Sequence, residues 1–249
     1  MDFKLANALG RIVELKDRST GAHTWRVTMY AQAMAEADRM PISEVLSFML
    51  GAVLHDFGKI DVPAEILSKP ACLTEDEYRT VQRHPIDGWE RLRRLGVDDP
   101  FVLNVVRSHH ERMDGSGYPD GLCGADIPVE ARWFAVIDAF DAMTGFRPYR
   151  DGIRETDAAR AIEDLEAHSG TWYEPRAVEV FKALHGAGRL DSILDHLNDK
   201  DGLLTPGTPL SKDVISMAHD ALLTSSPKSA DHQHIDAIIK LAKQTEIKS

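Results

Sequence analysis

Apolar residues recur at spacings of three and four along most of this chain, which is the period of an amphipathic α-helix. A clear example is the series Val27, Tyr30, Ala31 and Met34, in a segment that runs to about Asp38. No stretch of any length alternates apolar and polar residues as a half-buried strand does. No internal repeat is convincing either. The sequence therefore predicts an all-α fold.

Capping residues and helix breakers mark where the predicted helices begin and end. Thr74 and Glu77 have the spacing of a capping box, so a helix is expected from there to about Arg83. This helix should stop at His84-Pro85, and Gly88 should begin a further short helix. With these, the predicted helices cover 3–16, 20–38, 42–54, 74–83, 88–95, 100–110, 130–145, 155–168 and 175–185.

Composition limits the classes of protein to which the chain can belong. Its 249 residues suffice for one substantial core, and 43% hydrophobic and 28% charged residues are ordinary for a soluble protein. No apolar run approaches the roughly 20 residues that a membrane span needs. A formal net charge of −11 argues against binding along a large nucleic acid, which requires basic surface. Cys72 and Cys123 make no disulfide framework and no signal peptide is present, so the cytoplasm is the expected location.

The composition changes after Asn198. A stretch rich in Asp, Gly and Pro reaches to Pro209 and has the composition of a linker. Two short amphipathic patterns follow it. We therefore expect a domain of residues 1–198 and an extension of residues 199–249, consisting of the linker and two helices. Packing of these helices on their own domain is the simplest expectation, and a homodimer or protein-partner interface is the alternative.

The segment 42–54 is apolar nearly all round, so it should be buried. It nevertheless ends in the charged run His55-Asp56-Phe57-Gly58-Lys59. A buried charge is costly unless it is paired or bound to a metal, so this His-Asp pair needs a partner. Gly58 suits a helix exit with a positive φ. Gly115 and Gly117, in a later turn, should also serve backbone geometry.

A second helical run, residues 103–108, ends in His109-His110-Glu111 and then breaks into Asp114-Gly115-Ser116-Gly117-Tyr118-Pro119. Successive side chains on a helix point about 100° apart, so His109 and His110 cannot both lie on a core face. Histidine and carboxylate side chains are the usual ligands of divalent transition metals. The alternative is that one histidine caps the helix and the other lies on the surface.

Further candidate ligands stand near expected helix ends. His23 lies in a first turn, His84 lies at a helix boundary, and Asp138 interrupts a largely apolar helix on the same face as Asp141. Taken singly, His23 is a capping or surface residue and His84 is a C-terminal cap. As a set, they exceed the about four ligands of one structural zinc and suit a dinuclear centre. The candidate ligands are His23, His55, Asp56, His84, His109, His110 and Asp138.

From about residue 18 to residue 175, the chain resembles the HD superfamily of metal-dependent phosphohydrolases, and specifically its HD-GYP branch. The likeness is strongest in Leu54–Lys59 and in His109–Pro119, and the latter motif is specific by itself. Lys69-Pro70, His84-Pro85, Asp138–Met143 and Arg147–Arg150 add to it. The resemblance implies an HD-domain helical bundle that hydrolyses cyclic di-GMP, a bacterial second messenger. Some members of the branch act on cyclic GMP-AMP.

The resemblance also implies a dinuclear metal centre with a bridging hydroxide for attack on phosphorus. Two such metals lie about 3.5–4 Å apart and clamp the phosphate oxygens. Iron is the expected metal and manganese the second choice, since both suit imidazole and carboxylate ligands. One arrangement gives His23, His55, Asp56 and Asp138 to the first metal and His84, His109 and His110 to the second, with Asp56 bridging them.

Four side chains are expected to contact the substrate. Lys59, the predicted catalytic partner of Asp56, would neutralise charge on the phosphoryl group, and its alternative is a surface lysine that caps the preceding helix. Tyr118 would stack on a guanine or line the pocket. Arg147 and Arg150 would grip a second phosphate or a guanine edge, or else are charges on the rim.

The chain departs from the family pattern at Ser19. Some members have a glutamate there that helps to hold a third metal, and serine is a poor ligand. We therefore expect two metals and cleavage mainly to the linear dinucleotide pGpG, with little progression to GMP. Two alternatives stay open: a phosphohydrolase for another nucleotide, which the Gly-Tyr-Pro motif disfavours, and a signalling module that acts through protein partners.

Overall fold

The computed structural model describes residues 3–17, 23–145, 158–195 and 212–225. Within these ranges all regular elements are helical, and the extended pairing is limited to two isolated β-bridges, Asp114–Cys123 and Ser169–Tyr173. The prediction of an all-α fold is confirmed. None of the described helices is long and apolar enough to cross a membrane.

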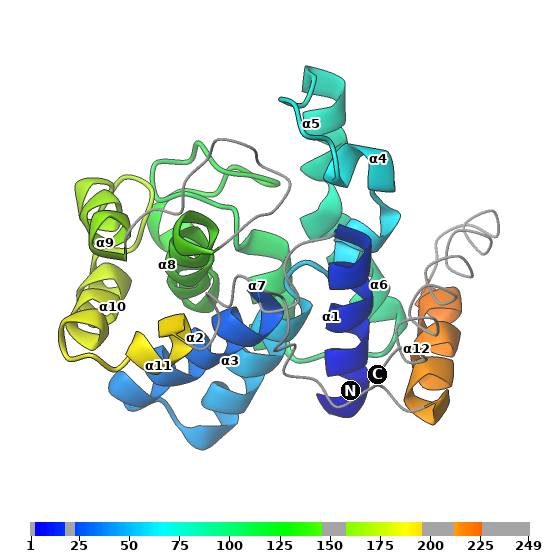
Figure 1. Cartoon of the computed structure of the whole chain (residues 1–249), viewed down its shortest axis with the longest axis horizontal. Helices are drawn as coiled ribbons and strands as arrows, with labels where there is room; N and C mark the ends of the chain where they lie inside the picture. Colours follow the sequence, from blue (N-terminus) through cyan, green and yellow to red (C-terminus); the bar gives the residue numbers. More distant parts are fainter. Residues whose placement is uncertain (1–2, 18–22, 146–157, 196–211, 226–249) are drawn as a thin grey trace.

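Figure 1 labels the α-helices in chain order. In order they are α1 (Phe3–Asp17), α2 (His23–Ala37), α3 (Ile42–Leu54), the 3-10 helix η1 (Phe57–Asp61), α4 (Ala64–Leu67), α5 (Glu75–Val81), α6 (His84–Arg94), α7 (Pro100–Ser108), the 3-10 helix η2 (Gly124–Asp126), α8 (Val129–Thr144), α9 (Ala158–Ala167), α10 (Pro175–Gly186), α11 (Asp191–Asp195) and α12 (Lys212–Ser225).

Two clusters of buried apolar side chains lie on either side of a shared wall, which α3 and α7 form. Phe48 on α3 and Val105 on α7 belong to one cluster, whereas Leu54 and Val106, on the same helices, belong to the other. Helices α8, α9 and α10 lie on one side of Figure 1 and α1, α6 and α12 on the other. The α8 cluster includes Tyr30, Phe134, Phe140 and Phe181, and the α1 cluster includes Leu9, Ile12, Phe57 and Leu92.

The boundary between α5 and α6 differs in part from the prediction. The capping box is confirmed, because the Glu77 amide donates to Oγ1 of Thr74 and the Thr74 amide donates to the Glu77 carboxylate. Helix α5 ends at Val81, before His84-Pro85 as predicted, but the expected start of the next helix at Gly88 is wrong, since His84 begins α6. Pro85 fits the first turn of a helix, where its missing N–H leaves no partner unsatisfied. His84 therefore lies at a helix N-terminus and is no C-terminal cap.

The first of the two C-terminal amphipathic patterns is the helix α12, which packs against α1 and α6 (Figure 1). Ala218 and Leu222 are fully buried in the α1 cluster. Packing of this helix on its own domain is therefore what the structure shows. The second pattern, residues 235–242, lies outside the described residues, and a domain boundary at residue 198 stays a prediction.

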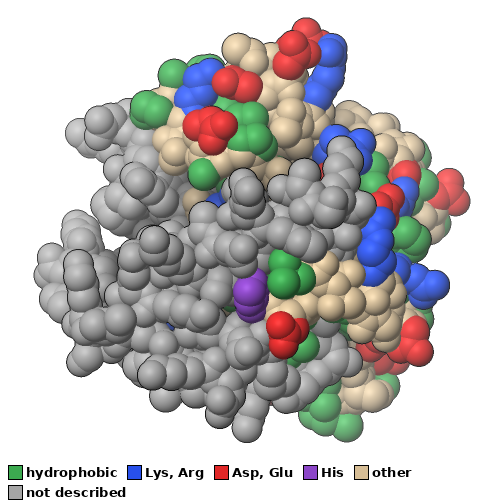
Figure 2. Space-filling view, turned by 90° about the vertical axis from the view of Figure 1, so that its right-hand side faces the viewer, with side chains coloured by type: hydrophobic (Ala, Val, Ile, Leu, Met, Phe, Trp, Pro, Cys, Tyr) green, Lys and Arg blue, Asp and Glu red, His purple; other side chains and the backbone are tan. Residues whose placement is uncertain are grey.

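The described surface on the side of α12 is chemically mixed. Lys and Arg side chains lie among acidic and apolar ones there and form no continuous basic surface within the described residues (Figure 2). The described part of this face therefore offers no track of positive charge for a nucleic-acid backbone.

Candidate metal centre

Asp56 lies at the centre of the candidate site. The chain leaves the end of α3 as His55 and then Asp56 before η1 begins. The Oδ2 atom of Asp56 lies 3.2 Å from Nε2 of His55 and 4.0 Å from Nε2 of His23. Its Oδ1 atom lies 3.3 Å from Nε2 of His84. The two oxygens of one carboxylate therefore face two different groups of imidazoles.

Backbone hydrogen bonds determine which ring nitrogen of these histidines faces the centre. Nδ1 of His55 and Nδ1 of His84 each lie 2.7 Å from a carbonyl oxygen three residues earlier. Nδ1 of His109 lies 3.0 Å from the corresponding oxygen. Because a carbonyl oxygen only accepts, each Nδ1 carries the hydrogen, and Nε2 of the neutral ring presents a lone pair. These lone pairs point toward Asp56 and toward one another.

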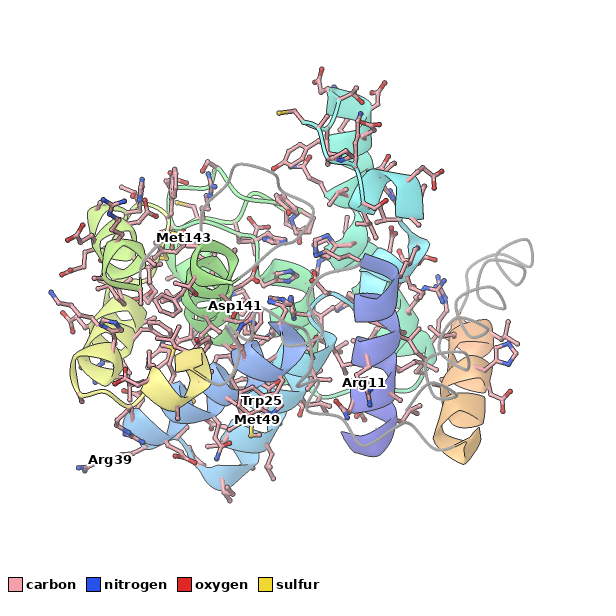
Figure 3. All side chains as sticks on the ribbon, in the orientation of Figure 1. Arg11, Trp25, Arg39, Met49, Asp141 and Met143 are labelled. Carbon is pink, nitrogen blue, oxygen red and sulfur yellow. The ribbon has the colours of Figure 1, made fainter. Side chains whose placement is uncertain are left out.

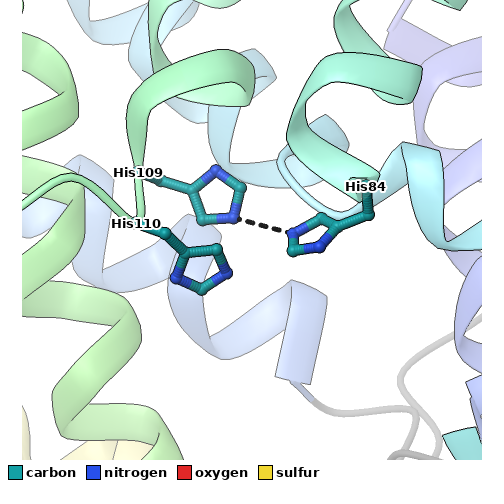
Figure 4. A group of neighbouring side chains, drawn as sticks. All are labelled: His84, His109 and His110. Carbon is teal, nitrogen blue, oxygen red and sulfur yellow. Dashed lines mark hydrogen bonds between the residues drawn. The ribbon is translucent and has the colours of Figure 1, made fainter. Parts of the chain in front are cut away.

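Two pairs of Nε2 atoms are in contact. The Nε2 atoms of His23 and His55 lie 3.2 Å apart, and those of His84 and His109 lie 3.3 Å apart (Figure 4). Two lone pairs at this distance repel unless a proton or a metal ion lies between them. The Oδ1 atom of Asp56 is buried and has no hydrogen-bond donor among the described residues. A buried acceptor without a donor is costly, so this donor set fits a pair of divalent cations.

Six of the seven candidate ligands lie in two groups. His23, His55 and Asp56 have ligand atoms within 4.8 Å of one another, and so have His84, His109 and His110. Figure 4 shows how the second group converges: His84 comes from the start of α6, and His109 and His110 follow the end of α7. All of these predicted residues are thus brought together around Asp56.

Burial keeps the second group of imidazoles neutral. It lowers the pKa of His84 to about 3 and that of His109 to about 4, and it holds the pKa of His110 well below its ordinary value. Burial, the largest influence on His55, also disfavours its charge, but Asp56, Asp138 and the Ala52 carbonyl together raise the pKa of His55. The pKa of Asp56 is lowered despite its burial, because His55 and Lys59 stabilise its charge. An ionised carboxylate among neutral imidazoles is the state in which these side chains bind metals.

Asp138 and Asp141 share one face of α8, as predicted, but they have different surroundings. Oδ1 of Asp138 lies 3.8 Å from Nε2 of His23, which brings this carboxylate to the first group. Asp138 is in the interior of α8, so the expectation that every candidate lies near a helix end is wrong for this residue. Helix α8 packs against α2, the helix that carries His23.

Asp141 is buried where α8 faces α2 (Figure 3). Its carboxylate accepts from Nε and Nη2 of Arg26, the latter at 2.9 Å, and from Nδ1 of His23 at 2.7 Å. Burial opposes its charge, but Arg26 and then His23 hold the pKa of Asp141 well below 3.8. Asp141 therefore fixes the ring of His23 with Nε2 toward the centre. Arg26 is not among the predicted site residues, although its place three residues after His23, in a stripe of buried residues, is a usable signal.

Lys59 reaches the site instead of capping a helix at the surface. Its Nζ atom lies 2.7 Å from Oδ2 of Asp56, and its side chain is 20% exposed. The ring of Tyr118 packs on His110 at a centroid distance of 4.7 Å, so Tyr118 lines the second group. Three predicted positions, Ser19, Arg147 and Arg150, lie outside the described residues.

Glu111 holds the turn that carries Tyr118, a role that the sequence analysis did not assign. Its buried carboxylate accepts from the amides of Asp120 at 2.7 Å and Leu122 at 3.0 Å. The two glycines of the turn serve backbone geometry, as expected. Gly115 has a φ of 80°, and a Cβ on Gly117 would lie 2.5 Å from Cα of Glu111.

Gly58 joins η1 to α6 by a close approach of backbones. The predicted positive φ at this residue is wrong. Instead, a Cβ on Gly58 would lie 1.9 Å from the carbonyl oxygen of His84 and 2.5 Å from the amide nitrogen of Gly88. Only glycine therefore lets the turn after Asp56 lie against the backbone of His84.

We expect Gly58→Ala to lower the free energy of unfolding by about 1–3 kcal/mol, because backbone atoms have to move apart. The same shift should separate Asp56 from His84 and weaken metal binding. Urea unfolding and metal analysis of the purified protein measure the two effects. Gly186→Ala is the matched control, because a Cβ there meets nothing within 4 Å. Equal stability and metal content of the two variants would contradict this account of Gly58.

Known proteins resemble the chain over the segment that carries the site. A family model described as HD domain matches residues 7–177. The response regulator RpfG of Xanthomonas campestris pv. campestris (strain 8004), named as a cyclic di-GMP phosphodiesterase, is 42% identical over 188 residues, covering 74% of this chain and 48% of the relative. A protein of Thermotoga maritima, also named as a cyclic di-GMP phosphodiesterase, is 38% identical, covering 73% and 49%. The 3'3'-cGAMP-specific phosphodiesterase 2 of Vibrio cholerae is 37% identical, covering 72% and 33%.

Two solved structures share the fold. The crystal structure of a cyclic GMP-AMP-specific phosphodiesterase of V. cholerae (V-cGAP3) superposes with a TM-score of 0.64 at 16% identity, covering 96% of this chain and 70% of that one. The HDG"Y"P protein Bd1817 of Bdellovibrio bacteriovorus superposes with a TM-score of 0.53 at 21% identity, covering 66% and 51%. At these identities the matches show the fold alone.

The chain spans about half the length of the two curated relatives named first. The family model nevertheless covers more than half of this chain and includes all seven candidate ligands, whereas α12 lies beyond its end at residue 177. The chain therefore belongs to the HD domain family.

Proposed function

We propose that this chain is a metal-dependent phosphodiesterase that hydrolyses cyclic di-GMP to linear pGpG. The observation that carries the proposal is the convergence of imidazoles on both oxygens of the buried Asp56 carboxylate. The names of two relatives at 42% and 38% identity supply the substrate. A second candidate substrate is 3'3'-cGAMP, which the relative from V. cholerae at 37% identity is named for.

We propose His23, His55, Asp56 and Asp138 as ligands of one cation and His84, His109, His110 and Asp56 as ligands of the other. When bound, such a pair lowers the pKa of a water and neutralises charge on the phosphate oxygens. Iron is our first choice and manganese the second, because imidazole and carboxylate suit both.

Side chains of the protein orient the proposed ligands and offset the charge of the phosphate. The hydrogen bonds at Nδ1 hold each imidazole with the lone pair of Nε2 toward the centre. Histidine ligands of metals are usually oriented in this way, by a hydrogen bond from the ring nitrogen that does not bind the metal. The ammonium of Lys59, next to Asp56, donates to a phosphate oxygen and offsets its charge. The ring of Tyr118, packed on His110, lines the place of a guanine. The predicted roles of Arg147 and Arg150 in gripping a phosphate or a guanine stay proposals, as does the cytoplasmic location.

We expect two tightly held metals per chain. The carboxylate of Asp141 already accepts hydrogen bonds from Arg26 and His23, so it is not available as a ligand for a third metal ion. The test is anaerobic loading with Fe²⁺ or Mn²⁺, metal analysis, and chromatography of the products from cyclic di-GMP and from 3'3'-cGAMP. pGpG should accumulate, with slow formation of GMP.

The matched control for this assay is the double variant His55→Ala, Asp56→Ala, which should bind neither metal and cleave neither substrate. Three metals per chain, or GMP as the main early product, would contradict the two-metal proposal. Full loading without cleavage of either dinucleotide would leave the signalling module that acts through protein partners as the better reading.

A further inference from the structure

We propose that α12, which lies beyond the segment matched by the family model, positions Lys59 in the candidate site through Arg91 and Asp61. The role of Lys59 toward substrate rests on the proposed function. The mechanical link between α12 and Lys59 rests on the contacts of the described residues alone.

Arg91 on α6 is the connecting residue. Its side chain is 1% exposed, although it carries a full charge. Nε donates to Oδ2 of Asp61 at 2.7 Å, and Nη2 donates to the other oxygen of the same carboxylate. Nη1 donates to the backbone carbonyl of Leu222 on α12 at 3.1 Å. A buried guanidinium keeps its place only if its donors are satisfied, so the α12 carbonyl is part of what fixes Arg91.

Asp61 is the last residue of η1, and Lys59 precedes it by two. On the other side of η1, the ammonium of Lys16 on α1 donates to the carbonyl oxygens of Lys59 and Ile60. The short helix is thus held between α1 and α6, and α12 packs against both of these helices. From Lys59 the Nζ atom reaches Asp56 at 2.7 Å.

Apolar packing joins the same elements. Ala218, Ala221 and Leu222 of α12 are buried in the α1 cluster together with Phe57 and Ile60 of η1. Undocking of α12 would therefore remove both a hydrogen-bond partner of Arg91 and part of the core beneath η1. Among the side chains that the structure describes, none from α12 belongs to the α8 cluster, which lies on the far side of the α3–α7 wall.

The test is hydrogen exchange of the 249-residue chain with Ala218→Asp, which places a charge in the buried face of α12. The probes are the amides of Lys59 and Val62, which donate to the carbonyls of Asp56 and Lys59. We expect their exchange to rise by about tenfold or more, with no change in α8. The control Thr224→Asp adds the same charge at an exposed position of α12 and should leave both regions unchanged.

Equal acceleration in η1 and α8 would mean general destabilisation and would overturn the proposal, as would no acceleration in η1. Asp61→Asn gives the same answer if Ala218→Asp does not fold, because it keeps the shape of the side chain and weakens only its bond to Arg91. The same selective rise at Lys59 and Val62 is expected.

A double-mutant cycle tests whether the effect passes through Lys59. Ala218→Asp should lower kcat for cyclic di-GMP by about tenfold or more, since a misplacement of about 1 Å can cost up to about a hundredfold. In a Lys59→Met background it should lower kcat no further. Independent, multiplicative losses would overturn the positioning role. If the wild-type chain cleaves no cyclic dinucleotide, the proposed function fails, whereas the exchange experiment still decides the link.

Discussion

Asp56→Asn is expected to lower phosphodiesterase activity by about a thousandfold or more and to release both metals. The substitution keeps the size and shape of the side chain and removes its charge. One of the two oxygens becomes an NH2 group, so a donor now faces either His55 or His84, whose Nε2 atoms lie 3.2 and 3.3 Å away. An amide therefore cannot replace the Asp56 carboxylate as a ligand shared by the two proposed metal ions.

Metal analysis after anaerobic loading and initial rates with cyclic di-GMP measure both effects of Asp56→Asn. Asp76→Asn on α5 is the matched control, because that side chain is 92% exposed and pairs only with exposed Arg79. It should retain both metals and full activity. If Asp56→Asn still held two metals per chain, Asp56 would not be the bridging ligand.

Asp141→Ala is expected to lower the free energy of unfolding by about 3–5 kcal/mol, because it leaves the guanidinium of Arg26 buried without its carboxylate. It should also weaken metal binding by about 10–100-fold, since Nδ1 of His23 loses the partner that orients the ring. The two effects separate in urea unfolding of the metal-free protein and in metal titration of the folded protein.

Asp38→Ala provides the comparison for Asp141→Ala. Asp38 also pairs with an arginine, Arg176, but the two side chains are 31% and 60% exposed. An exposed pair of this kind contributes at most about 1 kcal/mol. The account of Asp141 would be wrong if the two substitutions had equal effects on stability, or if Asp141→Ala left metal affinity unchanged.

The helices and most of the candidate ligands could be predicted because their signals are local. The apolar segment 42–54 and the charged His55-Asp56 pair at its end stand next to each other in the sequence, and so do the two histidines after α7. Helical spacing, caps and motif likeness need no knowledge of distant residues. Seven ligand candidates could therefore be named before their distances were known.

The rest depended on contacts between residues far apart in the chain. A His-Pro pair suits either the end of one helix or the start of the next, and the close approach of Gly58 to His84 is a feature of α6 starting there. Arg26 and Asp141 are 115 positions apart, so no local pattern tells a buried partner from a surface arginine. Glu111 likewise binds amides 9 and 11 positions ahead, in a turn without periodicity.

The wall of α3 and α7 between the two clusters has a consequence for the whole molecule. The proposed ligands come from both sides of it: His23 and Asp138 from helices of the α8 cluster, and His84 from a helix of the α1 cluster. Cations bound by these ligands would link the helices of the α8 cluster to those of the α1 cluster. A ligand that binds only the folded state raises the melting temperature as its concentration increases. The melting temperature of this protein would therefore depend on the metal concentration around it.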